Sequence, residues 1–480
     1  MSLNWQTCSQ ARLSRDARFD GKFFIGVLSS GIYCRSICPA RTANENNVRY
    51  YPTAAAAAEA GFRPCLRCRP ECSPGTPAWH GTSNTVSRAL RLINEGALEN
   101  GGVDVLAERL GIGSRHLRRL FLQHLGATPR AIAHTRRLHF AKQLIDETSL
   151  PIGHLALVSG FGCVRRFNAA IFATYHRTPT QIRRIARQKT ILPENEYLFR
   201  LSFRPPYHWK AMLAFLKLHA TPGVETVDLE SYRRSISLNG RHGYFEVSLD
   251  KSNKALNVRI QFEDPCSLYT IIERIRSMFD LNADWSTIAA KLRVDPALRK
   301  SVKTNPGMRV PGCWDGFELA TRAILGQYVT VEAATALTGK IVSAFGHPFS
   351  AASALTHLFP LPEDLAEAKL ETLGLTHARA ETIRSFARAV CKREIKFEGD
   401  VESDTLRARL CEIPGIRRWT AQYVVMRVLR EPDAFPSGNP DLQRALGLSR
   451  SRELEMRAEA WRPWRAYAAM YLWIIAKDCH

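Results

Sequence analysis

Two closely spaced cysteine pairs near the N-terminus constrain the fold of this chain more than any other feature. The stretches GIYCRSICPAR and GFRPCLRCRPE place Cys34, Cys38, Cys65 and Cys68 in a C-x3-C followed by a C-x2-C. Each pair can span one edge of a tetrahedron, which is the arrangement that four thiolates adopt around Zn²⁺. In a reducing cytosol such a cluster favours metal binding over disulfides. The spacing therefore predicts a small domain built around one four-cysteine zinc site.

The charge balance indicates a polyanionic partner. The chain has 67 Lys and Arg against 45 Asp and Glu, a net charge of +22, and a sequence pI near 9.8. This excess favours nucleic acid over a membrane surface. No apolar run approaches the roughly 20 residues of a membrane helix, and the N-terminus lacks an apolar signal core. We expect a cytoplasmic, bacterial-type, nucleoid-associated protein without a membrane partner.

Composition divides the chain into three segments. Residues 1–76 are rich in cysteine, and residues 78–190 hold 17 Lys and Arg against 6 Asp and Glu with helical periodicity. In the third segment, 196–480, strand-like alternation over about 196–265 gives way to amphipathic helices over about 266–480. The expected fold is multidomain and mainly α with α+β parts. It comprises a small zinc-bound α/β domain, an all-α double helix-turn-helix domain, and an α+β domain with a small antiparallel sheet and a helix-hairpin-helix core.

Five arginines surround the cysteines in the sequence, and positive surroundings favour thiolate character and a nearby phosphate. They are Arg35, Arg41, Arg63, Arg67 and Arg69. A closed structural zinc site, or buried thiols without metal, are the alternatives. The segment resembles the N-terminal domain of the Ada DNA-alkylation response proteins, whose GIxCRxxCxAR and GFRPCxRC blocks it matches almost completely.

That resemblance implies a role for the first cysteine of the set. In the family it is a zinc-bound nucleophile that takes a methyl group stoichiometrically from a methylphosphotriester in DNA, which here designates Cys34. Arg41 falls among the residues expected to contact DNA. Methylation would replace an anionic ligand by a neutral thioether, and so favour binding to DNA phosphates.

The second segment contains two helix-turn-helix patterns joined by a linking helix, with turns at Gly111 to Gly113 and Gly160 to Gly162. It resembles the DNA-binding domain of AraC-type transcription regulators. Leu117, Leu120, Phe121, Phe167 and Phe172 are expected to form the core. Recognition helices of this kind enter the major groove, and the expected DNA contacts are Arg115, His116, Arg118, Arg119, Arg165 and Arg166.

The third segment contains EIPGIRRWTAQYVV, in which a Pro-Gly turn between helices can present backbone N–H groups to a phosphate. Together with RVPGCWDGFELATRAILGQ and WRPWRAYAAMYLWIIA, it resembles the AlkA-type 3-methyladenine DNA glycosylases of the helix-hairpin-helix superfamily. The resemblance implies base flipping and a phosphate-binding hairpin at Gly415, Ile416 and Arg417. It also implies a wedge at Tyr328 and a base pocket of Phe215, Trp419, Tyr423 and Trp473.

Two positions depart from that family. Asn439 occupies the place of the catalytic aspartate, and Arg417 replaces a hairpin glycine, which could strain the phosphate contact. A neutral amide cannot supply the charge that stabilises an oxocarbenium-like transition state, a loss of about 3 kcal/mol or more. Asp441 could substitute for that carboxylate, but we expect it to cap the following helix instead.

Three hypotheses for Asn439 stay open: a deliberate substitution that traps DNA, natural divergence with slow residual activity, or conversion into a damage-binding module. The main expectation is an alkylation-response regulator that also excises 3-methyladenine and related bases from double-stranded, alkylated DNA. The alternative is a transcription factor that binds damage without efficient excision. We expect a monomer that contacts RNA polymerase, with zinc as the cofactor and none for the glycosylase domain. No PCHR-type site for repairing O6-methylguanine occurs in the sequence.

Overall fold

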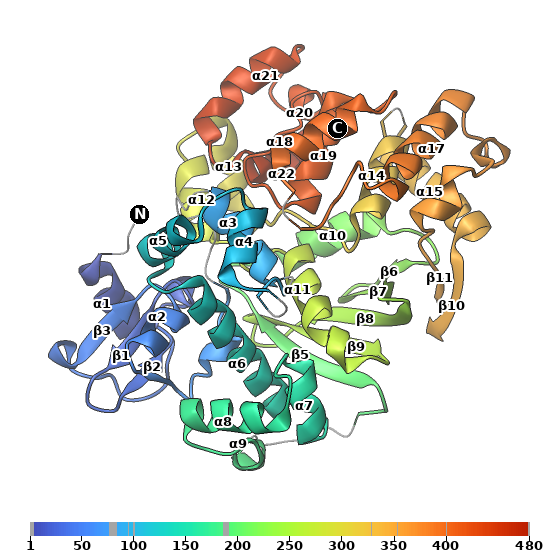
Figure 1. Ribbon diagram of the computed structural model, residues 1–480. Coiled ribbons are helices and arrows are strands. Elements are labelled where there is room, and N and C mark those ends of the chain that lie inside the picture. Colours follow the sequence, from blue (N-terminus) through green and yellow to red (C-terminus); the bar gives the residue numbers. More distant parts are fainter. Residues whose placement is uncertain are drawn as a thin grey trace.

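The computed structural model describes residues 4–75, 84–94, 96–98, 101–185, 192–327, 329–352, 354–399 and 401–478. Tyr328, the expected wedge, lies outside these ranges. In Figure 1 the N-terminal domain lies at the lower left, a large sheet at the lower right, and the C-terminal helices above them. Within the described ranges, no helix combines the length and apolarity needed to cross a membrane.

A four-stranded sheet carries the cysteine pairs. Its order is β3-β1-β2-β4, with β1 antiparallel to β2 and β3, and β2 parallel to β4. Thr53 caps the alanine-rich helix by accepting the N–H of Ala56, and Gly61 follows the helix at φ +89°. The elements are α1 (Trp5–Leu13), β1 (Phe24–Val27), β2 (Ile32–Cys34), β3 (Val48–Tyr51), α2 (Ala54–Glu59) and β4 (Arg63–Pro64).

The basic segment folds into two helix-turn-helix units that share a long helix, α6. Leu117 and Phe121 of α5, and Phe167 of α8, are fully buried as expected, and Leu120 is partly buried. Phe172 is 54% exposed, so its assignment to the core is wrong. The buried positions of α8 are 167, 171 and 175, a spacing of four residues that turns position 172 outward. The helices are α3 (Asn84–Asn94), α4 (Val103–Arg109), α5 (Ser114–Leu125), α6 (Pro129–Glu147), α7 (Ile152–Val158), α8 (Val164–Tyr175) and α9 (Pro179–Ile185).

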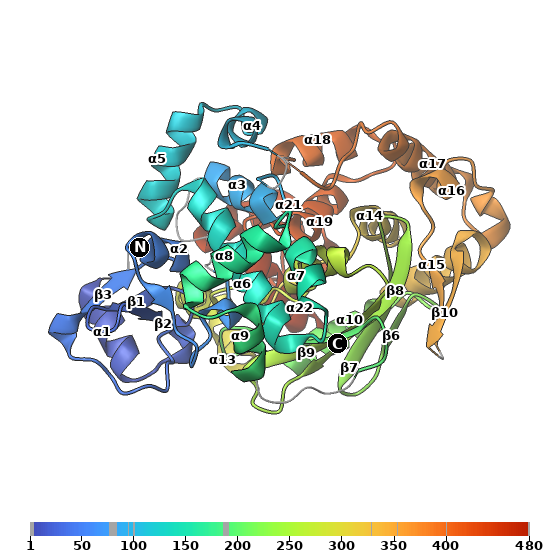
Figure 2. The ribbon, with the colours of Figure 1, turned by 60° about the horizontal axis from the view of Figure 1, so that its bottom comes forward.

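A five-stranded antiparallel sheet opens the third segment, in the order β5-β9-β8-β7-β6. One hydrophobic core joins it to the second helix-turn-helix unit, since Leu144 and Phe167 belong to the same buried cluster as Phe199 and Val258. Figure 2 shows α6 to α9 lying over this part of the molecule. The elements are β5 (Glu196–Ser202), α10 (Trp209–His219), β6 (Glu225–Val227), β7 (Ser231–Leu238), β8 (Arg241–Leu249), β9 (Ala255–Phe262) and α11 (Leu268–Met278).

The remaining residues form a helical subdomain with one short β-hairpin, in which β10 pairs with β11. The mainly α, multidomain fold expected from the sequence is therefore confirmed. The helices are α12 (Trp285–Leu292), α13 (Pro296–Thr304), α14 (Gly316–Leu325), α15 (Val331–Phe345), α16 (Pro362–Ala366), α17 (His377–Cys391), α18 (Ser403–Glu412), α19 (Arg418–Val428), α20 (Pro440–Arg444), α21 (Ser451–Ala458) and α22 (Arg465–Asp478), and the strands are β10 (His347–Ala352) and β11 (Leu355–Leu358).

Candidate zinc centre and base-binding site

The four cysteines meet at the end of the N-terminal sheet. Cys34 ends β2 and Cys65 follows β4, so the parallel pairing of these two strands brings the pairs together. The four Sγ atoms all lie within 4.8 Å of one another. Four soft sulfur donors at this separation fit a tetrahedral Zn²⁺ site.

The arginines near the cysteines have different roles. Arg35 is buried, its guanidinium pairs with Asp20, and its backbone N–H donates to Cys68 Sγ at 3.3 Å. Arg69 pairs with Asp146 and Glu147 of α6, each at 3.0 Å. Arg35 therefore stabilises the zinc domain itself, and Arg69 joins it to the helix-turn-helix domain. Arg41 and Arg67 are exposed and Arg63 is half-buried, so these three remain available to a phosphate.

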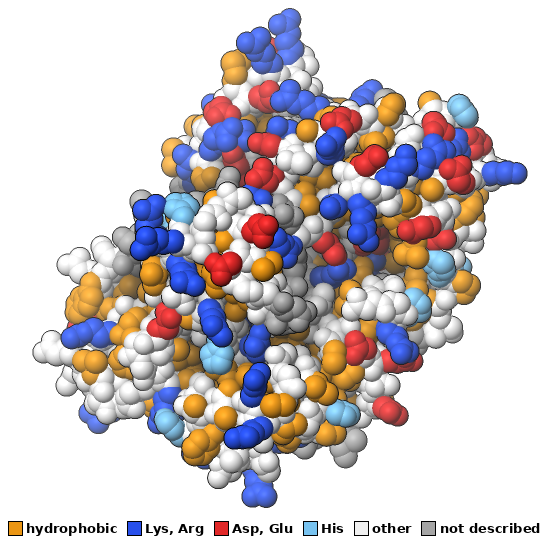
Figure 3. Space-filling model, viewed as in Figure 1, with side chains coloured by type: hydrophobic (Ala, Val, Ile, Leu, Met, Phe, Trp, Pro, Cys, Tyr) orange, Lys and Arg blue, Asp and Glu red, His pale blue; other side chains and the backbone are white. Residues whose placement is uncertain are grey.

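The two recognition helices present their basic side chains to solvent. All six expected DNA-contact residues of α5 and α8 are exposed, while Leu117 and Phe167 beneath them are buried. Figure 3 shows Lys and Arg side chains over α5 and following α6 on this face. The arrangement suits a surface that tracks phosphates on both sides of a groove. The expected residues are Arg115, His116, Arg118 and Arg119 on α5, and Arg165 and Arg166 on α8.

The four expected pocket aromatics converge from three helices, and each is half-buried. Tyr423 of α19 and Trp473 of α22 make an edge-to-face pair with centroids 6.1 Å apart. Phe215 of α10 joins them through Arg427, whose guanidinium lies 5.0 Å from the Phe215 ring and 5.3 Å from the Tyr423 ring. Trp419 lies next to Gly438, since a Cβ on that glycine would be 3.0 Å from Trp419 Cβ. Gly438 directly precedes Asn439, so Trp419 lies at the same site.

Asn439 lies at the edge of this aromatic cluster and caps α20. Its Oδ1 accepts the backbone N–H groups of Asp441 at 3.0 Å and Leu442 at 3.3 Å, and the indole N–H of Trp473 at 3.3 Å. Because all three partners are donors, the amide oxygen must face them. The amide NH₂ group therefore occupies the place that the second oxygen of an aspartate would take.

Asp441 does not cap the helix, so that expectation is wrong. It lies in the first turn of α20, its carboxylate pairs with Arg444, and its side chain is 51% exposed. Asn439 precedes the helix with extended backbone and is the residue whose side chain can reach the free N–H groups.

The hairpin between α18 and α19 is held by a side chain from a distant segment. Gln327 Nε2 donates to Gly415 O at 3.1 Å, and its Oε1 accepts Arg417 N–H at 2.9 Å and the Thr420 hydroxyl at 3.0 Å. Gly415 has φ +93°, whereas Arg417 has φ −78° and ψ 149°. The arginine in place of the family's glycine therefore introduces no backbone strain. Ile416 is buried and Arg417 is exposed.

Sequence reasoning missed three residues at this site: Gln327, Arg427 and His219. Arg427 donates to Pro311 O at 2.9 Å, Gly312 O at 3.0 Å and Tyr423 OH at 2.6 Å. Burial, and then the nearby Arg427, lower the pKa of His219 to about 3, so it is neutral where it stacks on Phe215 at 4.2 Å. Helical spacing could have revealed both, since each lies four residues after a predicted pocket aromatic.

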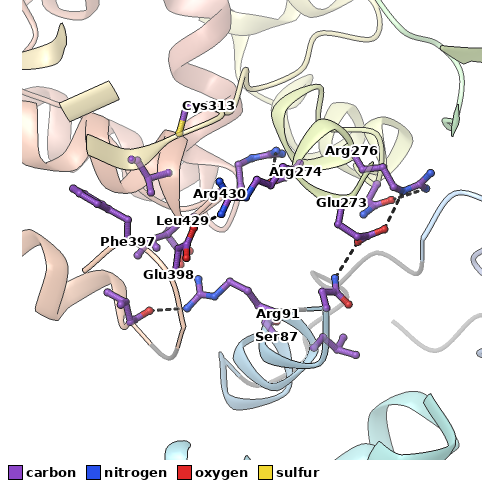
Figure 4. A pocket seen from close by; sticks show the side chains of 18 of the residues that line it. Ser87, Arg91, Glu273, Arg274, Arg276, Cys313, Phe397, Glu398, Leu429 and Arg430 are labelled. Atoms are coloured by element: carbon purple, nitrogen blue, oxygen red, sulfur yellow. Dashed lines mark hydrogen bonds and ion pairs between the residues drawn. The ribbon is translucent and has the colours of Figure 1, made fainter. Parts of the chain in front are cut away.

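A large cleft of about 1950 Å³ lies elsewhere. Residues 418, 422, 425 and 428 of α19 line it, whereas the pocket positions 419 and 423 lie on another face of that helix. Figure 4 shows Ser87 and Arg91 of α3 on one side and Glu398, Leu429 and Arg430 on the other. Its walls mix acidic and basic side chains, such as the Arg274–Glu398 pair, so it is an interdomain cleft rather than an aromatic base pocket.

Three family descriptions match this chain: "Metal binding domain of Ada" at residues 7–71, "Helix-turn-helix domain" at 106–185 and "AlkA N-terminal domain" at 198–315. The first match and the cysteine cluster together support Zn²⁺ as the bound ion. The second supports DNA as a partner.

Relatives cover the chain both whole and in part. The probable bifunctional transcriptional activator/DNA repair enzyme AlkA of Mycobacterium tuberculosis is 38% identical over 481 positions, covering 98% of this chain and 97% of the relative. The DNA-3-methyladenine glycosylase 2 of Escherichia coli is 32% identical over 282 positions, 58% of this chain and 96% of the relative. A solved 3-methyladenine DNA-glycosylase from Archaeoglobus fulgidus has the same fold, with a TM-score of 0.53 and 22% identity over 58% of this chain and 98% of that chain. The chain therefore belongs to the family of bifunctional transcriptional activators and DNA repair enzymes that combine Ada-type and AlkA-type domains.

Proposed function

We propose that this protein senses alkylation damage in DNA, regulates transcription in response, and removes 3-methyladenine and related bases by hydrolysing the N-glycosidic bond. The observation that carries the proposal is the pair of convergent sites: four sulfurs within 4.8 Å at one, and Asn439 beside Trp473 and Tyr423 at the other. The methyl acceptor, the base-pocket residues and the domain limits of 1–76, 78–190 and 196–480 are parts of the same proposal.

At the sensor, Cys34 is the proposed methyl acceptor. Cys34 and Cys38 are half-buried, whereas Cys65 and Cys68 are buried, and the family resemblance selects Cys34 from the two more open cysteines. Zinc, when bound, would keep the sulfurs as thiolates at neutral pH. The Cys34 sulfur attacks the methyl carbon, a C–S bond forms, and the C–O bond breaks with its electrons left on the phosphate oxygen. The products are a thioether and an ordinary phosphodiester anion.

At the base site, the aromatic rings are proposed to stack on the flipped base. An alkylated purine is electron-poor, and it recovers stacking energy on Phe215, Trp419, Tyr423 and Trp473. Backbone N–H groups near Gly415 and the positive end of α19 would bind a phosphate, with the exposed Arg417 adding charge. Asn439 would orient a water molecule, and Tyr328 would fill the space left by the base.

A second candidate function is damage binding with little excision. It is favoured by the bonding of Asn439, whose Oδ1 already accepts three N–H groups and whose remaining group is a neutral amide. Without a carboxylate, positive charge that develops on the sugar receives less stabilisation. Binding and stacking would be retained, and the domain would act as a damage receptor for the regulator.

The proposal also covers partners and cofactors. The protein would act as a monomer on double-stranded DNA in the nucleoid and contact RNA polymerase at promoters. Base excision would need no cofactor, since water and the leaving ability of a cationic base suffice chemically.

The test of the sensor is a mass measurement on the Cys34 peptide. After incubation of the zinc-loaded protein with DNA carrying methylphosphotriesters, this peptide should gain one methyl group and the Cys38 peptide none. The methylated protein should then bind its specific DNA more tightly at fixed salt, because one negative charge facing the phosphates is gone. An unmodified Cys34, or equal affinity of the two forms, contradicts this part of the proposal.

A further inference from the structure

Arg204, just after β5, is a buried arginine that joins two domains. Its side chain is 1% exposed, and its guanidinium donates Nε to Asp20 O at 2.8 Å and Nη2 to Gly75 O and Pro74 O, all in the N-terminal domain. Nη1 donates to Asn282 O at 2.7 Å in the glycosylase domain itself. Burial lowers the pKa of Arg204 to about 10, which leaves it charged at neutral pH. The Arg204 guanidinium group therefore donates hydrogen bonds to backbone carbonyls on both sides of the interface.

A buried ion pair crosses the same interface. Lys22 Nζ lies 2.6 Å from Asp284 Oδ2, with the two side chains 5% and 2% exposed. Lys22 also donates to the Ser286 hydroxyl at 3.1 Å, and Asp284 accepts hydroxyl protons from Ser286 and Thr287. Both charges are thus surrounded by partners, which a desolvated pair requires.

At Gly75 the backbone of the N-terminal domain contacts the side chain of Asn282 directly. Gly75 N–H donates to Asn282 Oδ1 at 3.0 Å, and a Cβ on Gly75 would lie only 2.8 Å from that oxygen. A larger residue at position 75 would therefore displace the Asn282 side chain and break this hydrogen bond.

The same contact leads directly to the zinc centre. Asp20 offers its carbonyl to Arg204 and its carboxylate to Arg35, with Arg35 Nε at 2.9 Å from Asp20 Oδ1. Arg35 follows the proposed methyl acceptor Cys34, and it also donates Nη1 to Cys68 O at 3.0 Å. Asp20 and Arg35 therefore connect Arg204 to the zinc ligands through hydrogen bonds.

We propose that Arg204, Asn282 and Asp284 form an interdomain socket whose partner is the zinc domain of the same chain. The socket couples the sensor to the glycosylase domain, so that zinc binding in the sensor stabilises the glycosylase domain. Such coupling is reciprocal. It requires that the interface exist only when both the zinc domain and the glycosylase domain are folded. This inference concerns binding and stability, and it stands whether or not the domain excises bases.

The test uses the full chain, loaded with zinc or treated with a chelator. Seven of the nine tryptophans lie between positions 209 and 473, so tryptophan fluorescence reports the glycosylase domain. Chelation should lower its unfolding temperature by about 3 °C or more. In Arg204→Gln this difference should vanish, while Arg200→Gln, an exposed change on β5, should keep it. The zinc content of each protein is measured in parallel.

A second variant distinguishes loss of interdomain coupling from misfolding of Arg204→Gln. Gly75→Leu leaves every residue of the glycosylase domain unchanged but displaces the Asn282 side chain at the interface, and it should reduce the difference while retaining one zinc per chain. Equal unfolding temperatures of the zinc-loaded and chelated parent chain would overturn the inference. So would a full difference that persists in both Arg204→Gln and Gly75→Leu.

Discussion

Asn439 gives a sharp prediction for stability, because its side chain caps α20. Asn439→Ala should lower the free energy of unfolding by about 1 kcal/mol, the usual value of a lost N-cap. Asn439→Asp should change it by only a few tenths, since aspartate caps equally well. Urea unfolding followed by tryptophan fluorescence measures both. Equal losses in the two variants would mean that the three N–H contacts do not stabilise the site.

His219 predicts a pH dependence. Its pKa is lowered to about 3 by burial and by Arg427 and Arg322, with Glu225 opposing them. Below about pH 6.5, His219 is protonated in the unfolded chain but stays neutral in the folded chain. The free energy of unfolding therefore falls as the pH drops from about 6.5 towards 3. The contribution is at most about 1.4 kcal/mol per pH unit. His219→Gln should show a shallower fall than the parent chain, and parallel curves would contradict the assignment.

The individual residues were predictable only where a motif marked them. Phe215, Trp419, Tyr423 and Trp473 stand at positions that a family resemblance supplies, and their convergence is compatible with that expectation. Helical spacing from Tyr423 marks Arg427 as a neighbour of the pocket, but its hydrogen bonds to the carbonyls of residues 311 and 312, more than a hundred residues away, could not be predicted. The choice between Asn439 and Asp441 as the helix cap depends on backbone direction, which two polar residues two positions apart do not reveal.

At the scale of elements, the hairpin between α18 and α19 predicts how DNA binding responds to salt. Arg417 is exposed at its tip and has ordinary extended dihedral angles. Arg417→Ala should leave the unfolding temperature unchanged and reduce the slope of log K against log salt by about 0.9, the value of one phosphate contact. Arg241→Ala, an exposed change on β8, serves as the control. An unchanged slope in Arg417→Ala would remove the hairpin arginine from the DNA interface.

Most elements follow from local pattern. Alternation predicted β7, β8 and β9, and helical periodicity predicted the helix-turn-helix units, since both depend on neighbouring residues. The β10–β11 hairpin was not predicted inside a segment expected to be helical, because its strands are short. Nor could the sequence show that Gln327 pins Gly415 and Arg417, a contact between positions 88 and 90 residues apart.

At the scale of the whole molecule, composition predicted three segments but not how they meet. The second helix-turn-helix unit and the β5–β9 sheet share one core, and the zinc domain is bound through Arg204 and Lys22. Such contacts depend on shape complementarity between distant surfaces, which no local pattern encodes. The protein is consequently an interlocked assembly rather than three independent units on linkers.

The most direct test of the proposed function is release of 3-methyladenine from alkylated duplex DNA by this chain and by Asn439→Asp, measured side by side. The aspartate form should be faster by about two orders of magnitude or more, because a carboxylate oxygen replaces the amide NH₂ group beside the pocket. The parent chain should bind the same DNA with similar affinity. Equal rates would show that the charge at position 439 does not limit excision, and no release by either form would contradict the assignment of a glycosylase site.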